Sequence, residues 1–181
     1  MEPTDRELLQ RLAGSDRTAL GPLMERHYQR LFRIAVSYLR DPDEALDAVQ
    51  ETFVKVYCHA SRWDGRSEAG AWLARIAINE AIDRYRRRRT RVSSMEALAS
   101  EPIPAAGEDP AAALARRENA ERVTLALASL SDTQRAVFVL RHQEEMTLDE
   151  IGRVLGLRIG TVKSRLHRAV RHLRERLGGT R

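Results

Sequence analysis

The side chains best suited to binding chemistry lie near the C-terminus, where basic and hydroxyl residues recur at helical spacing. One face of this segment carries Lys163, Ser164, Arg165 and Arg168. The opposite face is apolar, as in an amphipathic helix. Arg and Lys near the start of a helix can donate to guanine and to phosphates in the major groove of DNA. The pattern therefore predicts recognition of duplex DNA, and a basic face that is merely solvated is the alternative.

A short helix is predicted just before this segment. Thr147 can cap it, with Glu150 three positions later completing a capping box, and Gly156 can end it. Two helices joined by a four-residue connection, residues 157–160, form a helix-turn-helix. The capped first helix favours DNA binding over the solvated face.

Composition agrees with a helical protein that binds a polyanion. The 181 residues carry a formal net charge of +5, and all but two of the 31 basic residues are Arg. Arg favours bidentate contacts with phosphate and guanine, so nucleic acid is the first candidate partner, followed by an anionic membrane surface. Only 5% of the residues are aromatic, and no long alternating pattern predicts strands. We expect an all-α fold.

Other classes of protein find little support in the sequence. No apolar run is long enough to span a bilayer and the N-terminus does not resemble a signal peptide, so a cytoplasmic protein without membrane insertion is expected. Cys58 is the only cysteine, and the histidines lack metal-site spacing. We expect no cofactor, no metal site and no catalytic residues.

The segment from about Val92 to Ala112 separates two helical blocks. It contains Ser, Pro, Gly and acidic residues without a sustained apolar period. Because a structureless loop of this length is unusual inside one compact domain, we expect two small helical domains, residues 1–91 and 120–181, joined by a flexible linker, residues 92–119.

Four helices are predicted in the first block. They span about 5–12, 20–40, 42 to near 60, and 70–89. The second should turn Met24, His27, Tyr28, Leu31, Ala35, Tyr38 and Leu39 inward. The third should begin at the Asp41-Pro42 cap and bury Leu46, Val49, Phe53 and Val56.

The exposed face of the third helix is acidic. It carries Asp43, Glu44, Asp47, Gln50 and Glu51. A solvated face that favours the helix dipole and a docking surface for a basic partner explain this pattern equally well.

Two further features of the first block could contact nucleic acid. Trp63 lies in a polar loop, where it could pack on the neighbouring helices or wall a pocket for an unstacked base. The fourth helix ends in a run of Arg84, Arg86, Arg87, Arg88 and Arg89, followed by Arg91. Because these charges repel one another, a nearby polyanion should relieve them, and DNA or RNA contact is favoured over a solvated run.

Three stretches, in this order, resemble a bacterial extracytoplasmic-function sigma factor of the sigma-70 family. They are residues 41–53, 71–79 and 160–169. The resemblance covers about residues 20–90 and 120–177. It implies a sigma-2 domain that binds core polymerase and melts the −10 element, a linker, and a sigma-4 domain that reads the −35 element.

The resemblance also assigns roles to individual residues. It implies contact with core RNA polymerase, or support of that contact, by Asp43, Asp47, Gln50, Glu51 and Phe53. The −10 strand would be contacted by Trp63, Arg75, Asn79, Arg86 and Arg87. The −35 duplex would be contacted by Arg141, Thr161, Lys163, Ser164, Arg165 and Arg168. Family members usually have Phe-Arg-Gly where this chain has Trp63-Asp64-Gly65, and an anti-sigma factor commonly holds them inactive.

We therefore expect a non-enzymatic initiation factor whose partners are core RNA polymerase, promoter DNA and an anti-sigma factor. The alternative is a stand-alone helix-turn-helix regulator that binds duplex DNA without polymerase. The acidic helix and the linker argue against it, because operator binding needs neither. An RNA-binding or purely structural helical protein would leave the capped unit of residues 147–169 unexplained.

Overall fold

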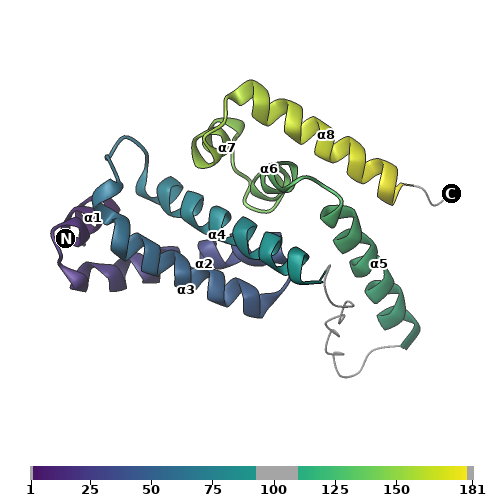
Figure 1. Cartoon of the computed structure of the whole chain (residues 1–181), viewed down its shortest axis with the longest axis horizontal. Coiled ribbons are helices and arrows are strands. Elements are labelled where there is room, and N and C mark those ends of the chain that lie inside the picture. The colour runs from purple at the N-terminus through teal and green to yellow at the C-terminus, as the bar shows by residue number, and fades with distance from the viewer. Residues whose placement is uncertain (1, 93–109, 179–181) are drawn as a thin grey trace.

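The computed structural model describes residues 2–92 and 110–178, and every regular element in these two ranges is a helix (Figure 1). The α-helices are α1 (Asp5–Ala13), α2 (Leu20–Leu39), α3 (Pro42–His59), α4 (Ala69–Val92), α5 (Pro110–Ala128), α6 (Asp132–His142), α7 (Leu148–Leu155) and α8 (Ile159–Leu177). Two short 3₁₀ turns, Arg17–Ala19 and Ala60–Arg62, complete the set. The all-α prediction is confirmed.

The first half is a bundle of α2, α3 and α4, with α1 packed across one end (Figure 1). Leu31, Val49 and Leu73, one from each long helix, are completely buried at its centre. Helix α3 begins as its sequence predicts, because the Asp41 carboxylate accepts hydrogen bonds from the backbone N–H groups of Asp43 and Glu44 at 3.1 Å. This cap fixes the end of α3 that carries the acidic side chains.

The second half contains the predicted helix-turn-helix. Thr147 and Glu150 form the capping box at the start of α7, with the backbone N–H of Thr147 2.7 Å from the Glu150 carboxylate. Gly156 ends α7 in the left-handed conformation, with φ of 66°. Helix α8 begins at Ile159, slightly earlier than predicted, and α5 packs along it through Leu127.

The two halves pack directly against each other. Helix α6 lies on α2 and α7 lies on α4, and one hydrophobic core runs through both halves. From the first half it includes Tyr38 and Ala74, and from the second Val137, Leu140 and Ile151. The sequence alone permits both closed and open arrangements, and the structure is closed.

Some predictions about burial and boundaries need correction. Met24 and Leu46 were expected inside but are 37% and 39% exposed. Each lies at the edge of its helix's apolar face, where no neighbouring element covers it. The predicted linker 92–119 is helical from Pro110 onward, while its central part, residues 93–109, lies outside the described residues. No helix in the described ranges is long and apolar enough to cross a membrane.

Candidate nucleic-acid interface

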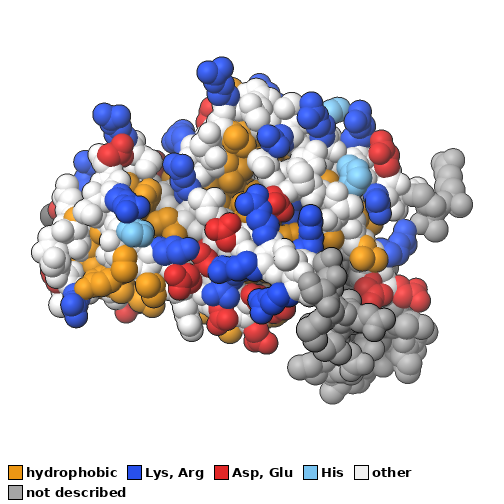
Figure 2. Space-filling view, in the orientation of Figure 1, with side chains coloured by type: hydrophobic (Ala, Val, Ile, Leu, Met, Phe, Trp, Pro, Cys, Tyr) orange, Lys and Arg blue, Asp and Glu red, His pale blue; other side chains and the backbone are white. Residues whose placement is uncertain are grey.

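The face of α8 that was predicted to read DNA points away from the rest of the protein. Lys163, Ser164 and Arg168 are exposed on it, and Thr161 and Arg165 are half-buried at its edge. Figure 2 shows Lys and Arg side chains along the surface over α7 and α8. Ser164 donates its hydroxyl proton to the Thr161 carbonyl at 3.0 Å, which holds it close to the helix. The three exposed side chains, Lys163, Ser164 and Arg168, can therefore approach a duplex without any rearrangement of the domain.

Arg141, the predicted −35 residue that precedes the helix-turn-helix, has a structural contact. Its guanidinium donates to the Met146 carbonyl at 2.8 Å, across the turn between α6 and α7. The side chain remains exposed. A guanidinium has five N–H groups, so Arg141 can hold this turn and still donate to a phosphate.

A cavity of about 310 Å³ lies between α3 and α4. It is lined by Lys55, His59, Arg62, Trp72, Arg75, Ile76 and Asn79. Arg75 and Asn79, two of the predicted −10 residues, are thus brought together with an aromatic ring and further cations. An amide, a ring and basic groups around one cavity can hydrogen-bond to a base edge, stack on it and bind its phosphate.

Sequence reasoning missed Lys55, Arg62 and Trp72 as site residues. A signal for Trp72 was available, because positions 72, 75 and 79 share one helix face at i, i+3 and i+7 spacing. Lys55 comes from α3 and Arg62 from the 3₁₀ turn that follows it, so only the fold shows that they join this cavity.

Trp63 lines a different cavity, of about 570 Å³, near α1. Its indole N–H donates to the Ser67 carbonyl at 3.2 Å. The guanidinium of Arg6 lies 5.6 Å from the centre of the indole ring and donates to the Gly65 carbonyl at 2.7 Å. Gly65 has φ of 72°, a conformation that favours glycine. Three of the five predicted −10 residues thus line two separate cavities, with Trp63 in one and Arg75 and Asn79 in the other.

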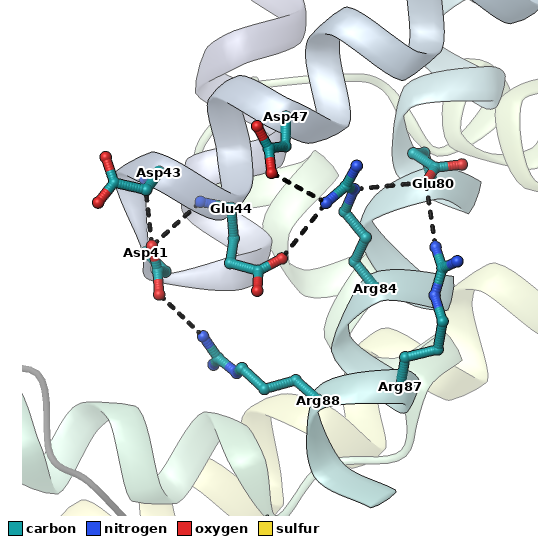
Figure 3. A network of polar contacts seen from close by, with 8 residues as sticks. All are labelled: Asp41, Asp43, Glu44, Asp47, Glu80, Arg84, Arg87 and Arg88. Carbon is teal, nitrogen blue, oxygen red and sulfur yellow. Dashed lines mark hydrogen bonds and ion pairs between the residues drawn. The ribbon is translucent and has the colours of Figure 1, made fainter. Parts of the chain in front are cut away.

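The arginine run at the end of α4 is largely neutralised by the protein itself (Figure 3). Arg84 lies 3.6 Å from Glu44, 3.4 Å from Asp47 and 3.4 Å from Glu80. Arg87 also pairs with Glu80, and Arg88 pairs with Asp41, both at 3.2 Å. The fourth arginine, Arg86, pairs with Asp132 at 2.7 Å and joins the two halves of the protein.

These ion pairs offset the repulsion between arginines that the sequence predicts for this run. Carboxylates from α3 and α4 relieve most of the run, so an external polyanion is not needed for that purpose. Arg89 and Arg91 are exposed and form no ion pair with a residue in the described ranges. Nucleic-acid contact by the run thus depends on these two, or on the exchange of existing ion pairs.

The acidic face of α3 presents Asp43, Asp47 and Gln50 to solvent, while Glu51 is half-buried. The Asp47 side chain is 63% exposed even though it contacts Arg84. Phe53 is only 3% exposed and packs in the core. Phe53 can therefore support a docking surface from below but cannot itself contact a partner in this arrangement.

Comparison with known proteins assigns the two halves of the chain to known protein regions. Residues 23–91 match sigma-70 region 2, and residues 120–173 match sigma-70 region 4. The chain is 38% identical to an RNA polymerase sigma-E factor of Streptomyces avermitilis, covering 81% of this chain and 78% of that protein. It is 29% identical to the ECF RNA polymerase sigma factor SigW of Bacillus subtilis, covering 98% of each.

Two solved structures have a similar fold. One is CnrH in complex with the cytosolic domain of CnrY, with a TM-score of 0.69, 28% identity, and coverage of 98% of this chain and 99% of the other. The second is the sigma factor RpoE of Bartonella quintana in complex with the anti-sigma factor NepR, with a TM-score of 0.62, 26% identity, and coverage of 89% and 98%. With both regions matched in order, and with 78% to 98% of the length of these relatives covered, this chain belongs to the extracytoplasmic-function group of the sigma-70 family.

Proposed function

We propose that this protein is a non-enzymatic alternative sigma factor that binds core RNA polymerase through α3 and promoter DNA through α4 and α8. One observation carries the proposal. A basic recognition helix and an acidic helix face are both exposed on one chain, in regions that match sigma-70 regions 4 and 2. A stand-alone operator-binding protein has no use for the acidic face. Acting on polymerase and DNA, the factor would work in the cytoplasm.

For the −35 element, we assign base and phosphate contacts to Lys163, Ser164, Arg165 and Arg168, with Arg141 and Thr161 at the edge. Their positions on the outer face of α8 support this assignment. Loss of one direct base contact should cost about 1–3 kcal/mol in binding, and loss of a phosphate contact should weaken all sequences alike.

For the −10 element, we assign the melted strand to the two cavities beside α4. Extruding a base costs a few kcal/mol, which stacking and hydrogen bonds to the base edge can offset. The cavity of Arg75 and Asn79 offers these groups together with Trp72. The cavity of Trp63 offers a second aromatic wall. Arg86 and Arg87 would join this surface by exchanging their carboxylate partners for phosphates.

The loop of Trp63 lacks the arginine that family members usually carry, and Arg6 offers a substitute. Its guanidinium contacts Gly65 and the indole ring of Trp63, the residues on either side of Asp64, which stands at the position of the missing arginine. We assign to Arg6 both the positioning of Trp63 and a phosphate contact beside it. The assignment makes α1 part of the −10 surface.

Core polymerase would bind Asp43, Asp47 and Gln50 directly, with Glu51 at the margin and Phe53 supporting the helix from the core. Two similar structures contain a sigma factor or its relative bound to a protein partner, and in one that partner is an anti-sigma factor. We therefore propose an anti-sigma factor as a further partner of this chain.

Run-off transcription with purified core polymerase on a pooled promoter library tests the proposal. Transcripts should appear only with the protein and should be lost in the double variant Asp43→Lys and Asp47→Lys. Glu25→Lys, at an exposed position on α2, is the single-site charge control and should remain active. Absence of any initiation, together with tight duplex binding by the protein alone, would instead establish the stand-alone regulator.

A second pair of variants tests the −35 surface. Arg168→Ala should reduce initiation from promoters with the preferred −35 sequence. Arg171→Ala removes an exposed arginine from the same helix, one that pairs with Glu175 at 3.8 Å, and should have little effect.

A further inference from the structure

Arg135 is a cation buried between the two halves of the protein. It lies on α6, is only 1% exposed, and is among the largest fully buried side chains. Its guanidinium carbon is 4.9 Å from the centre of the Tyr38 ring on α2 and 4.3 Å from that of the Tyr85 ring on α4. The two rings meet edge to face at 5.9 Å. Contact with aromatic faces is one of the few ways to compensate a buried cation.

Polar contacts between the halves surround this arginine. Asp132, three residues earlier on α6, accepts from Arg86 of α4 at 2.7 Å, and its carbonyl accepts from the Tyr38 hydroxyl at 3.4 Å. On the other side of the interface, Glu144 lies 3.5 Å from Arg33 of α2. Helix α6 and the turn after it are thus joined to α2 and α4 of the first half.

The closed arrangement involves residues that we assign to the −10 strand. Arg86 is occupied by Asp132. Arg75 lies against the end of α7, where a Cβ added at Gly156 would be 3.7 Å from its guanidinium. Closure thus pairs Arg86 with the second half, while Arg75 and Asn79 stay exposed, as does the −35 face of α8.

The closed arrangement is also too compact for a promoter. Elements named −35 and −10 are separated by about 25 base pairs, or about 85 Å of B-DNA at about 3.4 Å per base pair. The two halves of this protein are in direct contact, with ion-pair distances as short as 2.7 Å. One chain can contact both elements only after the interface of α6 and α7 with α2 and α4 has separated.

The interface between the two halves combines stabilising contacts with a destabilising one. The burial of Arg135 lowers the pKa of its guanidinium, because the charged form loses water. Its Nε and Nη1 groups have no hydrogen-bond partner among the described residues. Buried donors without a partner weaken an interface. The aromatic contacts and ion pairs stabilise the closed form, whereas the unpaired N–H groups of Arg135 destabilise it, and opening exposes these groups to water.

We propose that Arg135, seated between Tyr38 and Tyr85, is an intramolecular latch that holds the free factor closed, with its −10 and −35 surfaces too close together for a promoter, until core polymerase binds. The release by polymerase rests on the proposed function, whereas the latch itself is a property of the free protein. Polymerase opens the latch because it binds the separated halves better than the closed form.

Fluorescence transfer within the free, full-length chain tests the latch. Cys58 is exposed on α3 and is the only cysteine, so Arg171→Cys on α8 supplies a second labelling position in the other half. The protein labelled at Cys58 and at Arg171→Cys, the parent of this series, should show high transfer. The further change Arg135→Gln should abolish this transfer. Arg174→Gln, at an exposed position on α8, should retain it.

A charge exchange at the edge of the interface provides a test that does not depend on the folding of Arg135→Gln. Arg86→Asp and Asp132→Arg should each lower transfer, and the double variant should restore it. Far-UV circular dichroism identifies any variant that has merely unfolded. Equal transfer in the parent, Arg135→Gln and both single charge variants would overturn the latch.

Addition of core polymerase tests the release step. Transfer in the parent protein should fall to the level of the open variants. A transcriptionally active complex with unchanged high transfer would overturn release by polymerase. Loss of transfer in free Arg135→Gln, with no transcription from any form, would support the latch and refute the sigma-factor assignment, so the two failures are distinguishable.

Discussion

Gly152 on α7 should resist substitution because the chain folds back over it. After Gly156, the backbone turns so that Leu157 donates its N–H to the Gly152 carbonyl at 2.8 Å. A Cβ at position 152 would lie 2.9 Å from the Leu157 carbonyl oxygen. The obstacle is backbone, which cannot move aside like a flexible side chain. Gly152→Ala should therefore displace the turn that presents α8.

The net effect is the difference between two terms. Forcing an extra carbon into a packed site costs about 1–3 kcal/mol, and replacing Gly by Ala within a helix returns about 1 kcal/mol. We expect Gly152→Ala to lower the free energy of unfolding by up to about 2 kcal/mol. Gly160, on α8, is the matched control, since a Cβ there meets no atom within 4 Å. Gly160→Ala should raise the free energy of unfolding by about 0.5 kcal/mol.

Urea unfolding followed by circular dichroism measures both variants, and the midpoints should shift in opposite directions. Binding of a −35 duplex should also weaken in Gly152→Ala, because the turn sets the position of the recognition helix. If Gly152→Ala proved as stable as Gly160→Ala, the close approach of Leu157 would not constrain the turn, and the reasoning would be refuted.

Three further predictions follow from individual side chains. Burial raises the pKa of Glu144, so the folded protein binds a proton at this carboxylate more readily than the unfolded chain does. The free energy of unfolding of the wild type, relative to that of Glu144→Gln, should therefore rise as the pH falls from neutrality towards the ordinary pKa of 4.5. Urea titrations across that pH range would measure this difference. Glu80 is 2% exposed and contacts three cations, Lys55, Arg84 and Arg87. Because these cations are partly solvated, Glu80→Gln should cost about 2 kcal/mol, less than a fully buried pair, as measured by thermal melting against exposed Glu25→Gln. Arg6→Ala should weaken binding of the melted −10 strand and increase solvent quenching of Trp63 fluorescence, whereas Arg6→Lys should restore the charge but only part of the quenching protection, since Lys cannot reproduce the planar contact.

Features with local causes could be predicted from the sequence. The caps at Asp41 and Thr147 depend on residues two or three positions away, and Gly156 ends its helix by its own backbone freedom. The helix-turn-helix and the all-α fold followed from such signals. Helix α5 was missed at its start, because Pro110 suits the first turn of a helix as well as it suits a linker.

Features that depend on distant elements could not be predicted. The pairing of Arg84 and Arg88 with α3 requires the bundle geometry, so the arginine run looked like a site for an external polyanion. Arg135 has the same neighbours in sequence as many solvated arginines. Only the meeting of Tyr38 and Tyr85, on two different helices, makes it a buried group. Arg6 likewise acquires a role through contact with a loop nearly 60 positions later.

The hydrophobic core that runs through both halves affects how cooperatively the protein unfolds and how fast proteases degrade it in the cell. In the closed form, Val137, Leu140 and Ile151 belong to the same buried cluster as the first half, so the halves should melt in one transition. Separation divides this cluster and leaves the small second half to support itself. A factor opened without polymerase should then melt in two steps and offer proteases an early point of attack, which would limit how long unengaged, open molecules persist.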